Sequence, residues 1–192
     1  MSKDLSSNIL KEMQLKNGQE LVLRKPTTDD AKRMIEYLNI VGGESDNLLF
    51  GKDEFHLTVE KEMEHITNIC NSTNTLMILG IIDNNIVSIS QINSPNRKRI
   101  AHNSEISISV KKACWKNGIG SAVMEELIRF AKEHCTIKNI SLGVKASNDN
   151  AILMYEKFGF KKVGFHKDNF NVNGKFDDEI LMDLYLKDMP IP

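Results

Sequence analysis

The chain has few of the residues that mark a specialised environment. Its 192 residues include 3 cysteines, 4 prolines and 1 tryptophan, and aromatic residues make up 6%. The cysteines, at positions 70, 114 and 135, are scattered, with neither metal-site spacing nor the pairing of a disulfide framework. We therefore expect no bound metal and a reducing, cytoplasmic location.

Charge of one sign and long hydrophobic runs are also missing. The formal net charge is −1, so the composition gives no electrostatic case for a nucleic-acid partner. The longest apolar runs, such as residues 78–82, are far too short to cross a bilayer, and residues 1–4 lack the apolar core of a signal peptide. We expect neither nucleic acid nor a membrane as a partner. The hydrophobic content of 41% suits one sizeable core.

Hydropathy periods predict a mixed α/β order of elements. Asn17-Gly18 predicts a type I′ hairpin between two strands. Two helices follow, the first capped by Thr27 or Thr28 and the second running from Thr58 to about residue 70, with a loop at 41–55 between them. Their inward stripes are expected to be Met34, Ile35 and Leu38, then Val59, Met63, Ile66 and Ile69. Further strands are expected at 75–82, 86–93, 105–110, 140–144, 161–171 and 175–186, with helices after residues 118 and 148.

Two glycines lie where a predicted strand gives way to a predicted helix. Residues 105–110 alternate polar and apolar, and Ile119, Val123, Leu127 and Ala131 then recur at helical spacing. Gly118 and Gly120 would let an anion approach the free N–H groups of the first helical turn, where the helix dipole favours negative charge. The pattern indicates an anion site, although Asn-Gly before a helix is also a common turn.

A second strand-to-helix segment follows about thirty residues later. Ser147 or Asn148 is suited to cap the helix, and Gly159 is suited to end it. Together the two segments resemble the GNAT acyl-CoA N-acyltransferase family. The first is similar to its pyrophosphate motif, Gln/Arg-x-x-Gly-x-Gly/Ala. The second is similar to its signature Asn-x-x-Ala-x-x-x-Tyr-x-x-x-Gly-Phe, matched by Asn148, Ala151, Tyr155, Gly159 and Phe160.

The resemblance implies a fold and an organisation. It is sharpest over residues 104–165 and looser over 20–186. We expect an α/β (α+β) protein with a mixed, mostly antiparallel central sheet of about seven strands and helices on both faces. A single acetyltransferase domain is expected at 19–187, after an N-terminal extension and first hairpin strand at 1–18.

The resemblance also implies acetyl-CoA as co-substrate and a set of residues that bind it. The pyrophosphate would lie on the backbone N–H groups of the glycine turn, and pantetheine would pair with the strand that ends at Val110. The expected contacts are Ile108, Val110, Trp115, Lys116, Asn117, Gly118, Ile119, Gly120, Ser121, Asn148, Ala151 and Tyr155. Trp115 departs from the family pattern, because it replaces Gln or Arg; it would pack near the adenine or the helix, or serve as a half-buried anchor. Cys114 beside it is expected to be a small apolar filler.

Tyr155 matches the family's usual general acid. A free phenol has a pKa of about 10 and a thiol about 8.5, so full proton transfer to the leaving thiolate would be uphill without tuning. A hydrogen bond to the developing thiolate is the better description, and such a group gives roughly a hundred- to ten-thousand-fold in rate. The alternative for Tyr155 is a buried core residue. Asn148 can act as a helix cap and a CoA contact at once.

Glu105 is the candidate base that would deprotonate the attacking amine. It shares a strand face with Ser107 and Ser109, whose hydroxyls could order a water between carboxylate and amine. The alternative for Glu105 is an exposed strand carboxylate, and His102 is a weaker candidate base.

Acidic residues lie in the segments over which family acceptors enter. They are Glu44, Asp46, Asp53 and Glu54, then Asp168, Asp177, Asp178 and Glu179. Such walls would attract a cationic amine. The expected activity is therefore acetyl transfer to a primary amine (a small-molecule amine or polyamine, or a protein N-terminus) by direct attack in a ternary complex. A non-catalytic acyl-CoA-binding or sensing module is the alternative, and a homodimer is left open as the assembly.

Overall fold

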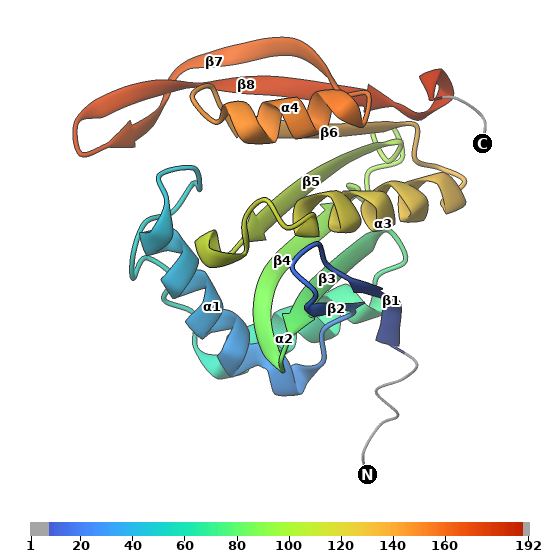
Figure 1. Cartoon of the computed structure of the whole chain (residues 1–192). Helices are drawn as coiled ribbons and strands as arrows, with labels where there is room; N and C mark the ends of the chain where they lie inside the picture. Colours follow the sequence, from blue (N-terminus) through green and yellow to red (C-terminus); the bar gives the residue numbers. More distant parts are fainter. Residues whose placement is uncertain (1–7, 190–192) are drawn as a thin grey trace. The chain divides into compact units, whose positions relative to one another are not determined.

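The computed structural model describes residues 8–189 (Figure 1). Its strands are β1 (Ile9–Gln14), β2 (Glu20–Arg24), β3 (Thr75–Ile82), β4 (Asn85–Asn93), β5 (Asn103–Val110), β6 (Asn139–Lys145), β7 (Lys161–Val172) and β8 (Lys175–Tyr185). Its α-helices are α1 (Ala31–Glu44), α2 (Val59–Asn71), α3 (Ile119–Glu133) and α4 (Asp149–Lys157). Residues 1–7 of the predicted N-terminal extension lie outside the described part.

The strands form an eight-stranded sheet in the order β1-β2-β3-β4-β5-β6-β8-β7. The pair β5–β6 is parallel, whereas β1–β2, β2–β3, β6–β8 and β7–β8 are antiparallel. The predicted mixed, mostly antiparallel sheet flanked by helices is confirmed, with eight strands where about seven were expected. Within the described residues the chain divides into two compact units, one with residues 8–92 and Ser107–Phe130, the other with Asn93–Ile106 and residues 131–189.

The first hairpin turns differently from the sequence prediction. Gly18 has φ +84°, and its N–H donates to the Leu15 carbonyl at 2.9 Å, while the Leu15 N–H donates to the Gln19 carbonyl at 2.8 Å. This is a three-residue connection with glycine in the left-handed position. A type I′ turn would also need a positive φ at Asn17, and the φ of Asn17 is not positive. The predicted hairpin is therefore right and its predicted turn type is wrong.

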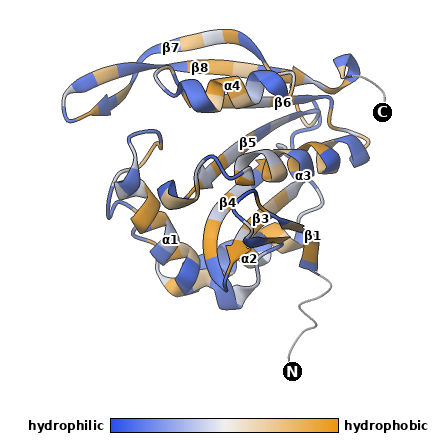
Figure 2. Cartoon of the chain, viewed as in Figure 1, coloured by the Kyte–Doolittle hydropathy of each residue, from blue (hydrophilic) through white to orange (hydrophobic). Residues whose placement is uncertain are grey.

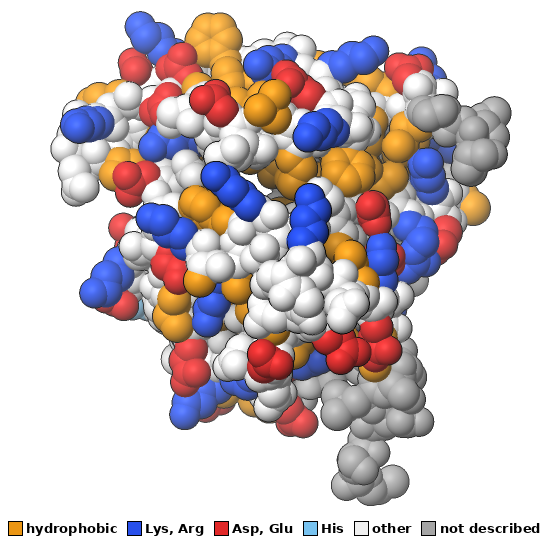
Figure 3. Space-filling model, viewed as in Figure 1, with side chains coloured by type: hydrophobic (Ala, Val, Ile, Leu, Met, Phe, Trp, Pro, Cys, Tyr) orange, Lys and Arg blue, Asp and Glu red, His pale blue; other side chains and the backbone are white. Residues whose placement is uncertain are grey.

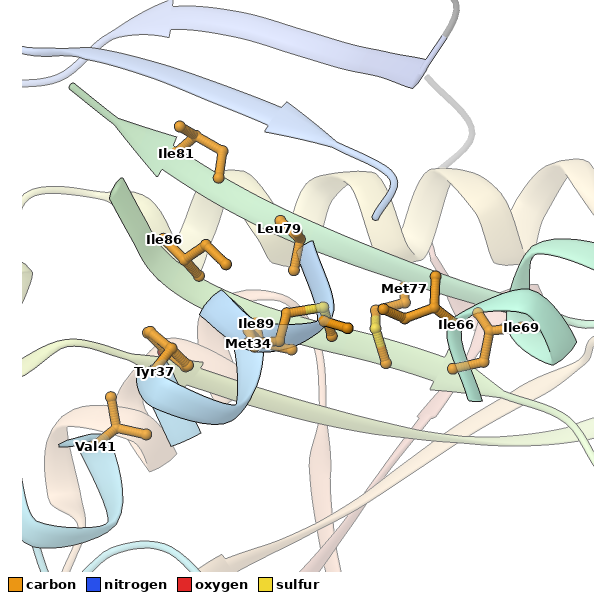
Figure 4. Close-up of a cluster of buried hydrophobic side chains, with 11 residues drawn as sticks. Met34, Tyr37, Val41, Ile66, Ile69, Met77, Leu79, Ile81, Ile86 and Ile89 are labelled. Carbon is orange, nitrogen blue, oxygen red and sulfur yellow. The ribbon is translucent and has the colours of Figure 1, made fainter. Parts of the chain in front are cut away.

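The core of the first unit lies between helices α1 and α2 and the strands β3 and β4. Figure 4 shows this cluster of buried side chains, which includes Met34, Tyr37, Val41, Ile66, Ile69, Met77, Leu79, Ile81, Ile86 and Ile89. Full burial of a side chain of this kind stabilises the fold by roughly 1.5–3 kcal/mol. Figure 2 shows hydrophobic stretches on β3 and on part of β4, where polar residues alternate with apolar ones.

Helix α1 is longer than predicted. It continues through Val41 and Gly42, both buried, to Glu44, where the sequence predicted a loop from residue 41. Two consecutive glycines are poor helix formers, which is why the sequence favours a loop. Gly42 is needed here because a Cβ at this position would overlap the carbonyl group of Gly51. Close packing of the following loop on α1 therefore outweighs the low helix propensity.

The inward face of α2 is also corrected. Thr58 caps the helix as predicted, since its hydroxyl accepts the Lys61 N–H at 3.3 Å. Val59 and Met63 are exposed, and the buried residues are Ile66, Ile69 and Glu62. The predicted stripe is therefore rotated, with a carboxylic acid in the place given to Met63.

The second unit is organised around β6. Ser104 of β5 pairs with Ile140 on one side, and Leu142 pairs with Met182 of β8 on the other. The long β7–β8 hairpin ends this part of the sheet, and α4 follows β6 in sequence. No helix within the described residues is both long and apolar enough to cross a membrane.

Candidate functional site

The glycine turn between β5 and α3 leaves backbone N–H groups at the start of a helix without helical partners. Lys116 has φ +64° and Gly118 φ +93°, so the chain reverses sharply before the helix begins. The first bond of the helical ladder runs from the Ala122 N–H to the Gly118 carbonyl at 3.0 Å. The N–H groups that precede it, through Ser121, have no partner inside the helix. They are available to a negatively charged group at the positive end of the helix dipole.

The loop before this turn is held by short backbone contacts. The Lys111 N–H donates to the Val87 carbonyl of β4 at 2.9 Å, and the Cys114 N–H donates to the Lys111 carbonyl at 2.9 Å. The latter bond belongs to a short 3-10 turn, Lys112–Cys114. Burial raises the pKa of the Cys114 thiol, which suits the predicted filler role and opposes that of a nucleophile.

Trp115 anchors the loop to the strand it leaves. Its indole N–H donates to the Val110 carbonyl at 2.7 Å, and the residue is 39% exposed. This is the anchoring alternative of the sequence analysis. A carbonyl oxygen has two lone pairs, so Val110 keeps one for a further donor. Ile108 and Val110 are both partly exposed, as strand residues that contact a ligand must be.

Tyr37 is a residue of this region that the sequence analysis missed. Its buried hydroxyl donates to Ser109 Oγ at 3.1 Å, and Ser109 Oγ donates to the Ile89 carbonyl at 3.1 Å. Burial raises the pKa of Tyr37 well above its usual value, so its phenol stays protonated. The sequence analysis predicted that Ser107 and Ser109 could both order a water. Because the Ser109 hydroxyl donates its proton to the Ile89 carbonyl, only Ser107 of this pair keeps a hydroxyl proton for a water. The helical spacing of Met34, Tyr37 and Val41 in the sequence could have predicted that Tyr37 faces inward.

In the second unit, Asn148 is the cap of α4. Its side-chain oxygen accepts the Ala151 N–H at 3.4 Å, which selects Asn148 over Ser147. Gly159, with φ +93°, ends the helix as predicted, and the Phe160 N–H donates to the Tyr155 carbonyl at 3.1 Å. The Asn148–Phe160 segment is thus a complete, locally specified helix with Tyr155 in its last turn.

Tyr155 is both a core residue and a chemically usable one. It is 8% exposed, and its ring packs against that of Phe160. Burial raises the pKa of Tyr155 to about 12, so the phenol remains a hydrogen-bond donor at any physiological pH. Among the described residues, its hydroxyl has no hydrogen-bond partner. Burial in the core is therefore compatible with the predicted role of Tyr155 as a hydrogen-bond donor to the thiolate.

Glu105 is exposed on β5, opposite Ser141 of β6. Ser141 in turn pairs with Asp183 of β8, whose carboxylate accepts the Tyr185 hydroxyl at 3.2 Å. The Glu105 side chain is open to solvent and to small molecules. His102 lies in the turn before β5, as predicted, and its carbonyl accepts the Lys138 N–H at 2.8 Å.

The acidic residues of the last hairpin are engaged with near neighbours. Glu179 accepts bonds from His166 Nδ1 at 3.0 Å and Asn169 at 3.1 Å, and Asp178 accepts the Asp168 N–H at 2.8 Å. A hydrogen bond from Ser147 is the main cause of a lowered pKa at Asp177. Glu179 and Asp178 hold the hairpin together, and Asp177 links it to the connection between β6 and α4.

Over the face shown in Figure 3, Lys and Arg side chains are interspersed with Asp and Glu. This agrees with a net charge near zero. No group of three or more His, Cys, Asp or Glu side chains within residues 8–189 is arranged to hold a metal ion.

Comparisons with known proteins show the family to which the chain is similar. Residues 49–160, more than half of the chain, match the family model described as Acetyltransferase (GNAT) family. An acetyltransferase of the GNAT family from Streptococcus pneumoniae is 30% identical and has the same fold with a TM-score of 0.83, over 86% of this chain and 99% of that one.

Two further proteins are similar. The L-amino acid N-acetyltransferase AaaT of Escherichia coli (strain K12) is 32% identical over 106 residues, which are 55% of this chain and only 65% of that protein. The protein yncA from Salmonella typhimurium, whose structure contains its cofactor acetyl-CoA, has a TM-score of 0.75 at 15% identity. That alignment covers 90% of this chain and 97% of that one.

Proposed function

Because the chain belongs to the GNAT family of acetyltransferases, we propose that it transfers an acetyl group from acetyl-CoA to a primary amine. The observation that carries this proposal is the glycine turn between β5 and α3. Its backbone supplies several N–H donors without partners in the helix, followed by a helix of four turns that adds its dipole. A pyrophosphate is the kind of ligand that such a turn binds.

Acetyl-CoA is the proposed co-substrate, with its pyrophosphate on residues 116–121. The acetyl-CoA bound to the similar fold of yncA supports this choice. Trp115 removes the side-chain donor that the family motif usually adds, so the backbone carries more of the binding here. Because backbone donors do not depend on side-chain identity, the departure at Trp115 is compatible with tight binding.

The proposed reaction is direct attack of the amine on the thioester. A C–N bond forms, the C–S bond breaks, and CoA leaves as a thiolate. Tyr155 would donate a hydrogen bond to that thiolate as its charge develops. With a phenol pKa of about 12, Tyr155 stabilises the thiolate without giving up its proton in the ground state.

Glu105 is the proposed acceptor of the proton that the amine loses. Its exposure allows a substrate or a water to reach the carboxylate. An ammonium has no lone pair, so a base matters most at pH values where the acceptor amine is protonated. The proton would pass to Glu105 directly or through a water, with Ser107 as the hydroxyl that can orient it.

The acceptor is proposed to be a primary amine on a small molecule, a polyamine or a protein N-terminus. The name of the similar Escherichia coli protein makes the α-amino group of L-amino acids the first small-molecule class to test. Acidic residues 44, 46, 53 and 54 in the α1–α2 segment favour a cationic partner.

A thiol-release screen tests the function. Purified protein is incubated with acetyl-CoA and a panel of L-amino acids, polyamines and N-terminal peptides, and free CoA is measured with a thiol reagent. Amine-dependent release supports the transferase. If acetyl-CoA binds by calorimetry and no amine gives release, the non-catalytic acyl-CoA-binding module becomes the better description.

A further inference from the structure

Helix α1 presents two polar side chains to one short stretch of chain. Tyr37 and Glu44 are separated by two helical turns and lie on the same face, with the buried Val41 between them. The Tyr37 hydroxyl donates to Ser109 at 3.1 Å, and Glu44 Oε2 accepts the backbone N–H of Lys112 at 2.7 Å. All of these residues belong to the same compact unit.

The two contacts match in spacing. Seven residues of α-helix span about 10.5 Å, and three residues of extended chain from Ser109 to Lys112 span about 10 Å. Helix α1 therefore runs alongside the end of β5 and fixes it at two points. Tyr37 fixes the strand itself, and Glu44 fixes the first residue of the 3-10 turn that leads to the glycine turn.

The Glu44 contact is the more informative of the two, because a negative charge cannot bind the phosphates of CoA directly. A carboxylate near a phosphate-binding turn repels the ligand, so any contribution that Glu44 makes to CoA binding must come from the geometry it imposes. The bond it accepts is charge-assisted and short, so it constrains the direction of the Lys112 peptide even at its exposed position.

We propose that Glu44 is a positioning residue for the CoA-binding turn, acting through the Lys112 N–H. The proposal rests on the proposed function for the identity of the ligand, and on the α1 contacts for the mechanism. With Lys112 fixed, the chain from Lys112 to Gly118 starts from one orientation, and the N–H groups of residues 116–121 are directed at one point before CoA arrives.

The test compares Glu44→Ala with Glu44→Gln in the full chain. Glu44→Ala removes the acceptor and is expected to weaken CoA binding about 10-fold by calorimetry, and to raise the KM for acetyl-CoA with little change in kcat. Glu44→Gln keeps an acceptor oxygen and is expected to bind CoA within about threefold of the wild type. Glu36→Ala, an exposed position of the same helix, is the matched control and is expected to change neither.

A reciprocal variant protects the test against misfolding of Glu44→Ala. Lys112→Pro deletes the donor at the first position of a 3-10 turn, and Lys111, with ψ 134°, already has the extended ψ that a following proline requires. Lys112→Pro is expected to weaken CoA binding as Glu44→Ala does. The variant that carries both substitutions is expected to bind CoA no more weakly than either single variant, because both remove the same hydrogen bond.

Hydrogen exchange separates the two proposals. In the ligand-free protein, Glu44→Ala is expected to speed exchange of the Lys112 amide, and Glu44→Gln to leave it slow. Unchanged exchange in Glu44→Ala, or CoA binding by Glu44→Gln as weak as by Glu44→Ala, would overturn the positioning role. Failure of the wild type to bind CoA would instead overturn the proposed function.

Discussion

The aromatic rings of Tyr155 and Phe160 lie with their centroids 5.8 Å apart and their planes tilted by 57°. The contact joins the last turn of α4 to the residue that follows its terminating glycine. Because Phe160 and the helix hold the Tyr155 ring in place, we expect Tyr155→Phe to remove the phenol oxygen without moving the ring.

We expect Tyr155→Phe to lower kcat by roughly a hundred- to ten-thousand-fold while acetyl-CoA binding changes little. The hydroxyl is proposed to act as thiolate charge develops, so its loss should be felt in the transition state. Steady-state kinetics and calorimetry on the same preparation measure the two effects. Wild-type turnover in Tyr155→Phe would show that the residue is only structural.

Gly120→Glu is expected to abolish CoA binding in a folded protein. The new carboxylate would meet the pyrophosphate at the start of α3, where the dipole and the free N–H groups favour an anion from outside. Gly120→Ala adds one methyl group and no charge, and is the matched control with a smaller expected loss. Undiminished CoA affinity in a folded Gly120→Glu protein would rule out this site for the pyrophosphate.

Replacement of Glu105 by Gln should depend on pH in a particular way. The rate at neutral pH should fall substantially, and the penalty should shrink at high pH, where the acceptor amine is already deprotonated. A pH–rate profile of kcat/KM for both proteins measures this. The same loss at every pH would point to a positioning role, and no loss would leave Glu105 as a surface carboxylate.

The buried carboxyl group of Glu62 is expected to make the stability of the protein depend on pH. Glu62 is 1% exposed, its Oε2 has no hydrogen-bond partner among the described residues, and burial raises its pKa. A carboxyl whose pKa is raised by folding stabilises the protein fully below its usual pKa, and this contribution is lost as the pH rises through the raised value.

Glu62→Gln should therefore raise the free energy of unfolding at pH 7 by roughly 1–3 kcal/mol, a Tm increase of about 2–4 °C per kcal/mol. The gain should shrink toward pH 4, because wild-type Glu62 is then neutral too. Urea titrations at several pH values test this, with the exposed Glu64→Gln on the same helix as control. A gain that does not vary with pH would contradict the burial argument.

The parts of the site that sequence predicted are those specified by local signals. The glycine turn, the Asn148 cap and the Gly159 stop depend on residues within a few positions of one another. Each also has a backbone reason, such as the positive φ of Gly118 and Gly159. Hydropathy periods likewise located every main strand to within a few residues.

The parts that sequence did not predict depend on distant neighbours. The pairing of Tyr37 with Ser109 and of Glu44 with Lys112 joins residues about seventy positions apart, which no local pattern reports. The burial of Glu62 in place of Met63 has the same origin, because the packing partners of α2 decide which side of the helix is covered.

The parallel pairing of β5 with β6 has a consequence for how the protein folds. Asn103 pairs with Asn139, and the glycine turn and all of α3 lie between them in sequence. A parallel pair cannot be closed by a tight turn, so this crossover must be completed before the ladder forms, which makes it a slow, non-local event. In a refolding experiment, recovery of CoA binding should therefore lag behind recovery of helical circular dichroism.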